Sequence, residues 1–165
     1  MMNYYTAGHF FSHKGIIKIE NRIFYDIEDM DVFMIKVWNS VVGKGDTVYH
    51  LGDFCFGPED RTRVILERLN GEICLMRSPR DDVKTLMKCG LRDIRSEFLV
   101  RDGDKMIMMS HHAQPWWEGK ERGDYHFHGY DSTRSVPLMK RRFDVSVGLW
   151  NYYPKTAEQI ISGEI

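Results

Sequence analysis

The chain has 165 residues, of which 42% are apolar and 28% charged, values close to the average for globular domains. This length and composition predict a single domain over residues 1–165 and exclude collagen-like, disulfide-scaffold and largely disordered proteins. Lys and Arg number 23 against 24 Asp and Glu, so the formal charge is -1. Any binding of an anion must therefore depend on a local cluster of basic side chains.

The cysteines and the N-terminal residues indicate the cellular compartment of the protein. Cys55, Cys74 and Cys89 leave one thiol unpaired in any disulfide scheme and show no Cys-x-x-Cys spacing, which favours buried thiols in a reducing compartment. The first residues lack a basic region followed by an apolar core, and no uninterrupted apolar run exceeds four residues. We therefore expect a cytoplasmic protein with no membrane partner.

Apolar residues at helical spacing predict three helices in the first half of the chain. Asp26 and Asp29 stand like a capping pair before the first of them, and Gly90 ends the third, which is the usual chemistry of helix starts and stops. The predicted spans are 30–41, 58–69 and about 81–89.

Short segments of strand character lie between and after these helices, at 3–7, 47–51, 72–77, 94–100, 105–110 and 143–147. Residues 101–104, Arg-Asp-Gly-Asp, predict a hairpin turn between two of them. Strands that alternate with helices and then follow one another predict an α/β fold with a parallel sheet and a more antiparallel second half. Sites in such sheets form at the carboxyl ends of strands, where His9, Asp53, Arg77 and His111 are placed.

The most informative stretch is 46–57, Asp-Thr-Val-Tyr-His-Leu-Gly-Asp-Phe-Cys-Phe-Gly, which follows Trp-Asn-Ser-Val-Val at 38–42 and precedes Leu-Asn-Gly at 69–71. These phrases closely resemble the small calcineurin-like metallophosphoesterases of bacteria and phages. The resemblance extends over nearly the whole chain, through 9–17, Met-Ser-His at 109–111 and the closing segment 144–154. It implies a four-layer α/β sandwich in which seven ligands hold two divalent ions.

Position by position, the resemblance implies that few of those ligands remain. The family's Asp-x-His motif reads Ala-Gly-His at 7–9, which keeps His9 and loses the aspartate, with a one-residue ambiguity between the first two positions. The Gly-Asp motif is intact, so Asp53 stands where a carboxylate bridges both ions. His111 keeps the ligand of the Ser-His motif.

Two further motifs have changed. Gly-Asn-His-Asp reads Ser-Pro-Arg-Asp at 78–81, so Arg80 replaces the histidine thought to protonate the leaving group, and a guanidinium cannot act as a general acid near pH 7. Gly-His-x-His reads Gly-Tyr-Asp-Ser at 129–132, which removes two more imidazoles. We expect no bound cofactor. The alternative is one Mn or Zn ion on His9, Asp53 and His111, with His112, His128 or Asp131 recruited to it.

Because the framework phrases persist while the catalytic set has changed, the sequence favours a pseudoenzyme with no catalytic residue. It would act by binding a protein partner or a phosphate-containing ligand, and the family analogy suggests a phage or mobile-element factor that acts on a host protein. Arg77, Arg80 and His111 are the candidate ligand-binding side chains. The alternative is a metal-dependent phosphodiesterase or phosphatase with a reduced, mononuclear site.

A protein partner would have an aromatic surface to bind. The candidate interface residues are Trp116, Trp117, Tyr125 and Tyr130, the residue types enriched at binding hot spots. The alternative is that both tryptophans pack as a lid. The basic run 140–142 is interpreted as a solvated turn, so a nucleic-acid partner is not expected. His50, inside a predicted strand, is expected to be structural.

Overall fold

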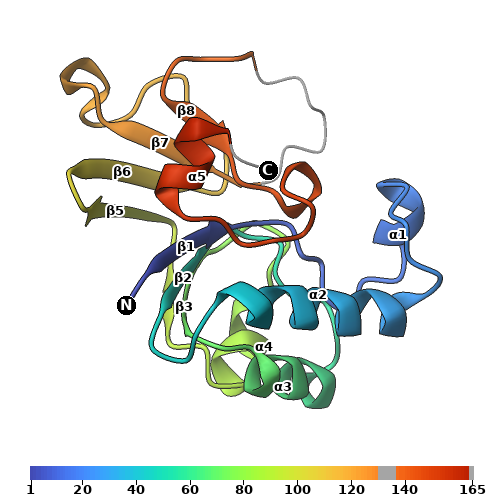
Figure 1. Ribbon diagram of the computed structural model, residues 1–165. Helices are drawn as coiled ribbons and strands as arrows, with labels where there is room; N and C mark the ends of the chain where they lie inside the picture. The colour runs from blue at the N-terminus through green and yellow to red at the C-terminus, as the bar shows by residue number, and fades with distance from the viewer. Residues whose placement is uncertain (130–136, 164–165) are drawn as a thin grey trace.

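The structure, a computed structural model, describes residues 1–129 and 137–163. Two four-stranded sheets carry the fold (Figure 1). The first is parallel throughout, in the order β1 (Asn3–Thr6), β2 (Thr47–His50), β3 (Glu72–Met76) and β4 (Asp93–Arg95). The second has the order β5 (Glu97–Asp102), β6 (Lys105–Ser110), β7 (Tyr125–His128) and β8 (Arg142–Asp144).

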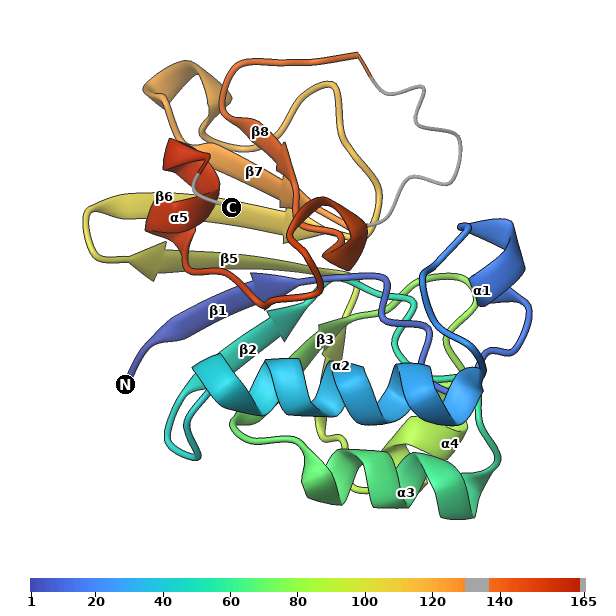
Figure 2. The ribbon, with the colours of Figure 1, turned by 45° about the vertical axis from the view of Figure 1, so that its right-hand side comes forward.

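Helices cover the outer face of the first sheet, and the second sheet packs against its inner face (Figure 2). The covering helices are α2 (Ile27–Val41), α3 (Glu59–Arg68) and α4 (Val83–Lys88). The remaining helical segments are α1 (Ile16–Ile19), α5 (Ala157–Ser162) and two short 3-10 turns, η1 (Lys120–Arg122) and η2 (Val147–Leu149). One apolar core lies between these helices and the first sheet, with Trp38 and Met34 at its centre. A second lies between the sheets around Tyr5, Met76 and Phe127.

The three predicted helices are present where the capping signals placed them. The carboxylate of Asp26 accepts the backbone N–H of Asp29 at 2.9 Å and so begins α2. The carboxylate of Asp82 does the same for Thr85 at the start of α4. Each cap satisfies an N–H group that has no partner within its helix. The sequence indicated the cap at Asp26, whereas the cap at Asp82 is seen only in the structure.

The strand predictions need two corrections. The predicted strand 94–100 is two strands, β4 and β5, which belong to different sheets. β7 was not among the strand segments predicted from the sequence. Among the described strands of the second sheet, β5 and β6 pair antiparallel around the predicted hairpin, while β6–β7 and β7–β8 are parallel. The second sheet is therefore mixed, and more antiparallel than the first, as predicted.

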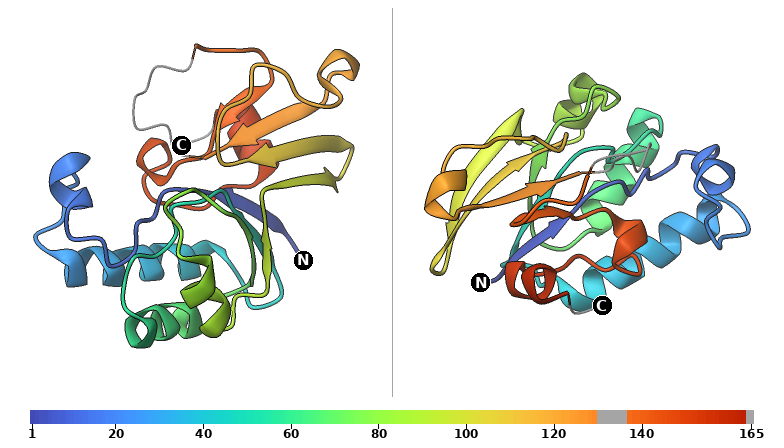
Figure 3. Two further views of the ribbon diagram at one scale, coloured as in Figure 1. Left: turned by 180° about the vertical axis from the view of Figure 1, so that it is seen from behind. Right: turned by 90° about the horizontal axis from the view of Figure 1, so that it is seen from above.

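A loop and a short helix lie beside the two sheets. Residues 111–124 form a loop that packs Trp117 on His126 of β7, with 5.4 Å between the ring centroids. The ribbon of this loop lies next to β7 (Figure 3). α5 instead packs beside β1, where Lys155 bridges to Tyr5 and protects the edge of the first sheet.

All three cysteines are free and buried, as expected. In the described part of the chain, no helix is both long enough and apolar enough to cross a membrane.

Candidate functional site at the strand ends

The loops after β1 and β2 are joined by backbone hydrogen bonds. The N–H of Gly8 donates to the carbonyl of Gly52 at 3.0 Å, and the N–H of Phe10 donates to the carbonyl of Asp53 at 2.9 Å. Phe10 and Asp53 both have a positive φ, 53° and 58°, a region that non-glycine residues rarely adopt. Strained backbone of this kind is typical of functional sites.

Asp53 forms an ion pair with Arg80. Nε of Arg80 donates to Oδ1 of Asp53 at 3.1 Å, and Nη2 donates to Oδ2 at 2.5 Å, the fork geometry of a bidentate pair. The Asp53 side chain is 0% exposed, whereas that of Arg80 is 49% exposed. A fully buried carboxylate is costly unless it is compensated, and the guanidinium of Arg80 supplies that compensation from the solvent side.

Asp81 fixes the backbone that carries this pair. Its buried carboxylate accepts three backbone N–H groups, from Asp53 at 3.1 Å, Phe54 at 2.8 Å and Ser78 at 2.7 Å. These bonds tie the loop after β2 to the loop after β3. The sequence reading named Asp81 only as part of a motif and missed this positioning role.

His111 completes the cluster. Its Nδ1 lies 2.7 Å from the carbonyl oxygen of Leu51, and its Nε2 lies 3.9 Å from Oδ2 of Asp53. Because a carbonyl can only accept, Nδ1 carries a proton, and Nε2 faces Asp53. Two glycines make room for the ring: a Cβ on Gly52 would lie 2.4 Å from Nδ1, and one on Gly129 would lie 3.0 Å from it.

His9 does not join this cluster. Its Nδ1 lies 2.9 Å from Nε2 of His50, and its ring stacks on Phe11 and contacts the edge of Trp38 inside the core. Burial lowers the pKa of both imidazoles, that of His50 to about 3, so both rings are neutral. His9 is thus a core residue, and the expectation that it survives as a site residue is corrected.

The position that faces the site belongs to Phe10. Its ring centroid lies 5.0 Å from the guanidinium carbon of Arg80 and 5.5 Å from that of Arg22. The side chain after β1 that faces the site is therefore Phe10, one position later than the histidine that the sequence resemblance implied. The side chain of Phe10 has no atom that can bind a metal ion.

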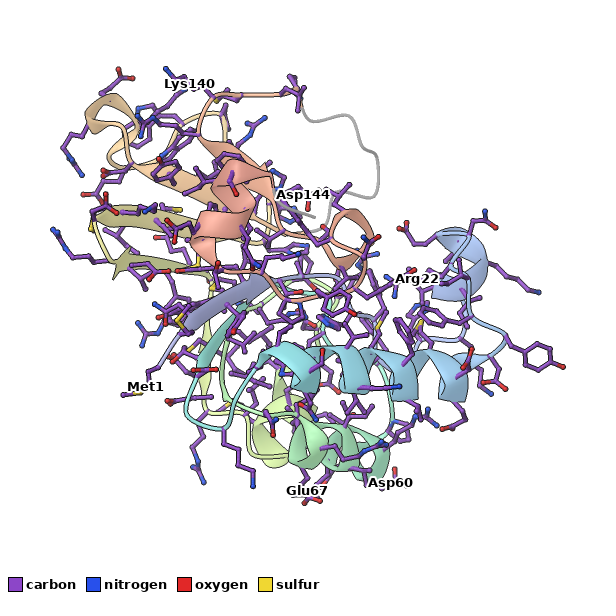
Figure 4. All side chains as sticks on the ribbon, in the orientation of Figure 1. Met1, Arg22, Asp60, Glu67, Lys140 and Asp144 are labelled. Atoms are coloured by element: carbon purple, nitrogen blue, oxygen red, sulfur yellow. The ribbon has the colours of Figure 1, made fainter. Side chains whose placement is uncertain are left out.

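Arg22 holds this loop in place, and the sequence reading assigned it nothing. Its Nη1 donates to the carbonyl of His9 at 2.9 Å and its Nη2 to that of Gly8 at 2.8 Å. It reaches the strand ends from the segment after α1 (Figure 4). A single arginine in a polar segment carries no signal of such a role, because its partners are backbone atoms distant in sequence.

The other predicted residues lie further from the ion pair. Arg77 is exposed at the end of β3, and the described contacts do not join its guanidinium to Arg80 or His111. Trp116 is 62% exposed. Tyr125 is half-buried beneath the guanidinium of Arg141, and Tyr130 lies outside the described residues.

Trp117 is 1% exposed, and its Nε1 donates to the carbonyl of Asp124 at 3.0 Å. Its ring packs on His126 under the loop. Trp117 therefore packs as part of the fold. Of the two tryptophans, Trp116 has the exposed ring that a binding surface needs.

The donor set does not fit a pair of metal ions. Within residues 1–129 and 137–163, no three His, Cys, Asp or Glu side chains gather where they could hold an ion. Asp53 and His111 face each other, but both oxygens of Asp53 accept from Arg80. Phe10, whose ring contacts Arg80, and Pro79, which precedes Arg80, have no side-chain atom that could bind a metal ion.

The sequence was compared with protein-family models and with curated proteins. No protein-family model matches the chain. An uncharacterised protein of Methanocaldococcus jannaschii is 29% identical over 160 residues, covering 96% of this chain and 88% of that protein. The Gene 66 protein of Mycobacterium phage L5 is 41% identical over 54 residues, which are 33% of this chain and 26% of the phage protein.

Two solved structures are similar. A protein of unknown function from Aquifex aeolicus superposes with a TM-score of 0.74 at 21% identity, over 99% of both chains. An archaeal phosphodiesterase superposes with a TM-score of 0.50 at 18% identity, over 88% of this chain and 82% of the other. The chain therefore has a mixed α/β fold like that of a phosphodiesterase. At these identities the likeness concerns the fold alone.

Proposed function

We propose that the protein is a pseudoenzyme of the calcineurin-like metallophosphoesterase type, with a degenerate form of the four-layer sandwich, which acts by binding rather than by hydrolysis. The observation that supports this is the bidentate pair between Arg80 and Asp53. Two-metal hydrolysis needs a carboxylate that bridges two cations and activates a water molecule. Here the carboxylate accepts from a guanidinium, which neither activates water nor donates a proton near pH 7.

The ligand that suits this edge of the sheet is a phosphate-containing molecule. Arg80 keeps half of its side chain exposed while it binds Asp53, so its outer edge can meet a phosphate oxygen. His111 lies beside it, and His112 and Arg77 are exposed at the same strand ends. Guanidinium and imidazole groups are the usual donors to phosphate.

A protein partner is the second candidate, and Trp116 favours it. Its ring is 62% exposed on a loop that several contacts hold in place, among them the bond from the N–H of Gln114 to Nε2 of His126 at 3.1 Å. An exposed tryptophan on an ordered loop is typical of a binding hot spot. The partial likeness to a phage protein is compatible with the proposal of a phage or mobile-element factor that acts on a host protein.

The alternative is a phosphodiesterase that uses one metal ion, bound to Asp53 and His111 when Arg80 moves away. Hydrolysis of bis-p-nitrophenyl phosphate with manganese chloride, measured for the wild type and Asp53→Asn, separates the two. We expect turnover indistinguishable from the uncatalysed rate in both proteins, together with binding of inorganic phosphate that Arg80→Ala weakens. Manganese-dependent turnover that Asp53→Asn abolishes would establish the alternative.

A further inference from the structure

We infer that β5 is the edge at which two copies of this chain pair, so that their second sheets join into one sheet across a two-fold axis. The inference is independent of the proposed function, because β5 carries none of the residues placed in the site. β5 is an outer strand of the second sheet and pairs on one side with β6. The hairpin of these two strands extends to the side of the molecule away from α1 (Figure 1).

The outer edge of β5 offers backbone groups at every second residue. The hairpin loop has two residues, 103–104, so the residues that flank it, Asp102 and Lys105, form a hydrogen-bonded pair. Counting back along β5, every second residue then directs its N–H and C=O away from β6. These residues are Glu97, Leu99 and Arg101. Among the residues that the structure describes, no hydrogen bond from another segment reaches their backbone groups on that side.

The inner face of β5 holds the strand in place. Phe98 is 7% exposed and belongs to the core between the sheets, and the guanidinium carbon of Arg95 lies 4.5 Å from its ring centroid. At the other end, the hydroxyl of Tyr5 on β1 donates to Oδ2 of Asp102 at 2.8 Å. The edge is therefore extended and ordered before a partner binds, which lowers the entropy cost of pairing.

The outward side chains of β5 complement those of a second copy. In an antiparallel pair with its two-fold axis at Leu99, this residue faces itself, and Glu97 of each copy faces Arg101 of the other. Leu99 is 46% exposed, and Glu97 and Arg101 are exposed on either side of it. In the described part of the chain, neither charged side chain has an ion-pair partner. Opposite charges and apolar side chains directly across from one another both stabilise strand pairs.

Other positions of the axis fit less well. An axis at Glu97 sets two carboxylates opposite one another, and an axis at Arg101 sets two guanidinium groups opposite one another, both of which are destabilising. An axis at Phe98 brings Arg95 opposite Arg101 of the second copy. An axis at Val100 places Glu97 opposite the uncharged Gly103 of the hairpin turn. The charges therefore select the axis at Leu99.

Pairing of this kind ends at two chains. Of the other outer strands in the described residues, β4 and β8 have three residues each, and the edge of β1 is covered by the bridge between Tyr5 and Lys155. Each chain thus offers one long edge, and a two-fold pair uses it in both copies. β5 also lacks the proline and lysine residues that usually keep an open edge from pairing.

Sedimentation velocity tests the inference on purified wild type, Glu97→Arg, Arg101→Glu and the double variant that carries both changes. The wild type should dimerise as its concentration rises over about 5–500 µM, because an interface of one strand pair is small and weak. Each single variant sets like charges opposite one another and should weaken dimerisation about tenfold or more. The double variant exchanges the two charges and should restore the affinity to within about threefold of the wild type.

Glu67→Arg and Arg68→Glu make the same charge changes at exposed positions of α3 and should dimerise as the wild type does. Leu99→Lys is a second variant, which sets two ammonium groups opposite one another at the axis and should also keep the chains apart. Thermal unfolding of each variant shows that a monomer is still folded. A wild type that stays monomeric up to about 500 µM would overturn the inference, as would a dimer that the β5 variants leave intact, or a double variant no better than the single ones.

Discussion

His9 and His50 share one hydrogen bond, 2.9 Å long, in the core beneath the loops that carry Phe10 and Asp53. Both rings are 0% exposed, and neither Nε2 of His9 nor Nδ1 of His50 has a hydrogen-bond partner among the described residues. Burial lowers the pKa of His50 to about 3 and that of His9 well below 6.5. The pair is thus a neutral core contact that links the loop after β1 to the end of β2.

We predict that stability falls steeply in mild acid because of these two rings. Their pKa values are lower in the folded chain, so the unfolded chain binds more protons, and stability that is full above about pH 6.5 is lost as the pH falls below it. Each histidine adds a slope of up to about 1.4 kcal/mol per pH unit. His50→Gln, which keeps a partner for His9, should flatten the pH dependence of urea unfolding, whereas His112→Gln should not. Equal slopes in both variants would contradict this assignment.

Asp81→Asn should destabilise the site loops. The carboxylate accepts three backbone N–H groups, and an amide presents only one oxygen, so at least one buried N–H is left unpaired at a cost of about 1–3 kcal/mol. Asp82→Asn is the matched control, because asparagine is an equally good N-cap for α4. Thermal unfolding should show a clear loss of Tm for Asp81→Asn alone. A similar Tm in the two variants would show that Asp81 does not hold the site loops in place.

Replacement of Gly129, which lies against the ring of His111, should disturb the site. A Cβ at Gly129 would lie 2.1 Å from the carbonyl oxygen of Leu51 and 3.0 Å from Nδ1 of His111, whereas one at Gly148 meets no atom within 4 Å. We expect Gly129→Ala to displace the ring and lower the Tm, and Gly148→Ala to leave it unchanged. Imidazole NMR shifts of His111 in the two variants test whether the ring has moved; an unmoved ring in Gly129→Ala contradicts the account.

The two adjacent tryptophans should have opposite effects. Truncation of the buried Trp117 to alanine removes its packing on His126 and should cost about 3–5 kcal/mol of stability, while Trp116→Ala should leave stability nearly unchanged because its ring is exposed. If a protein partner is bound through this loop, Trp116→Ala should weaken binding about thirtyfold, the usual effect at a hot spot. Normal partner binding by a folded Trp116→Ala protein would show that the interface does not include Trp116.

The sequence located the elements whose signals are local. The helix cap at Asp26 and the turn at 101–104 involve neighbours in the chain, so composition and spacing were enough. The division of 94–100 between two sheets depends on partners distant in sequence, β3 on one side and β6 on the other. No periodicity within the segment could have indicated it.

The site was predictable in part for the same reason. Asp53, Arg80 and His111 stand in distinctive phrases, and the structure brings these three together. His9 differs because a shift of one residue after β1 exchanges a side chain that faces the site for one that faces the core. Only the contacts of His9 with His50 and of Phe10 with Arg80 decide between the two positions.

The central claim is that Arg80 stands in the place of a metal ion, and elemental analysis of the native protein tests it most directly. The wild type would be produced in medium supplemented with manganese and zinc, purified without chelators, and its metal content measured per chain. The account predicts much less than one equivalent of any divalent transition metal. One or two equivalents per chain, lost on Asp53→Asn substitution, would contradict it.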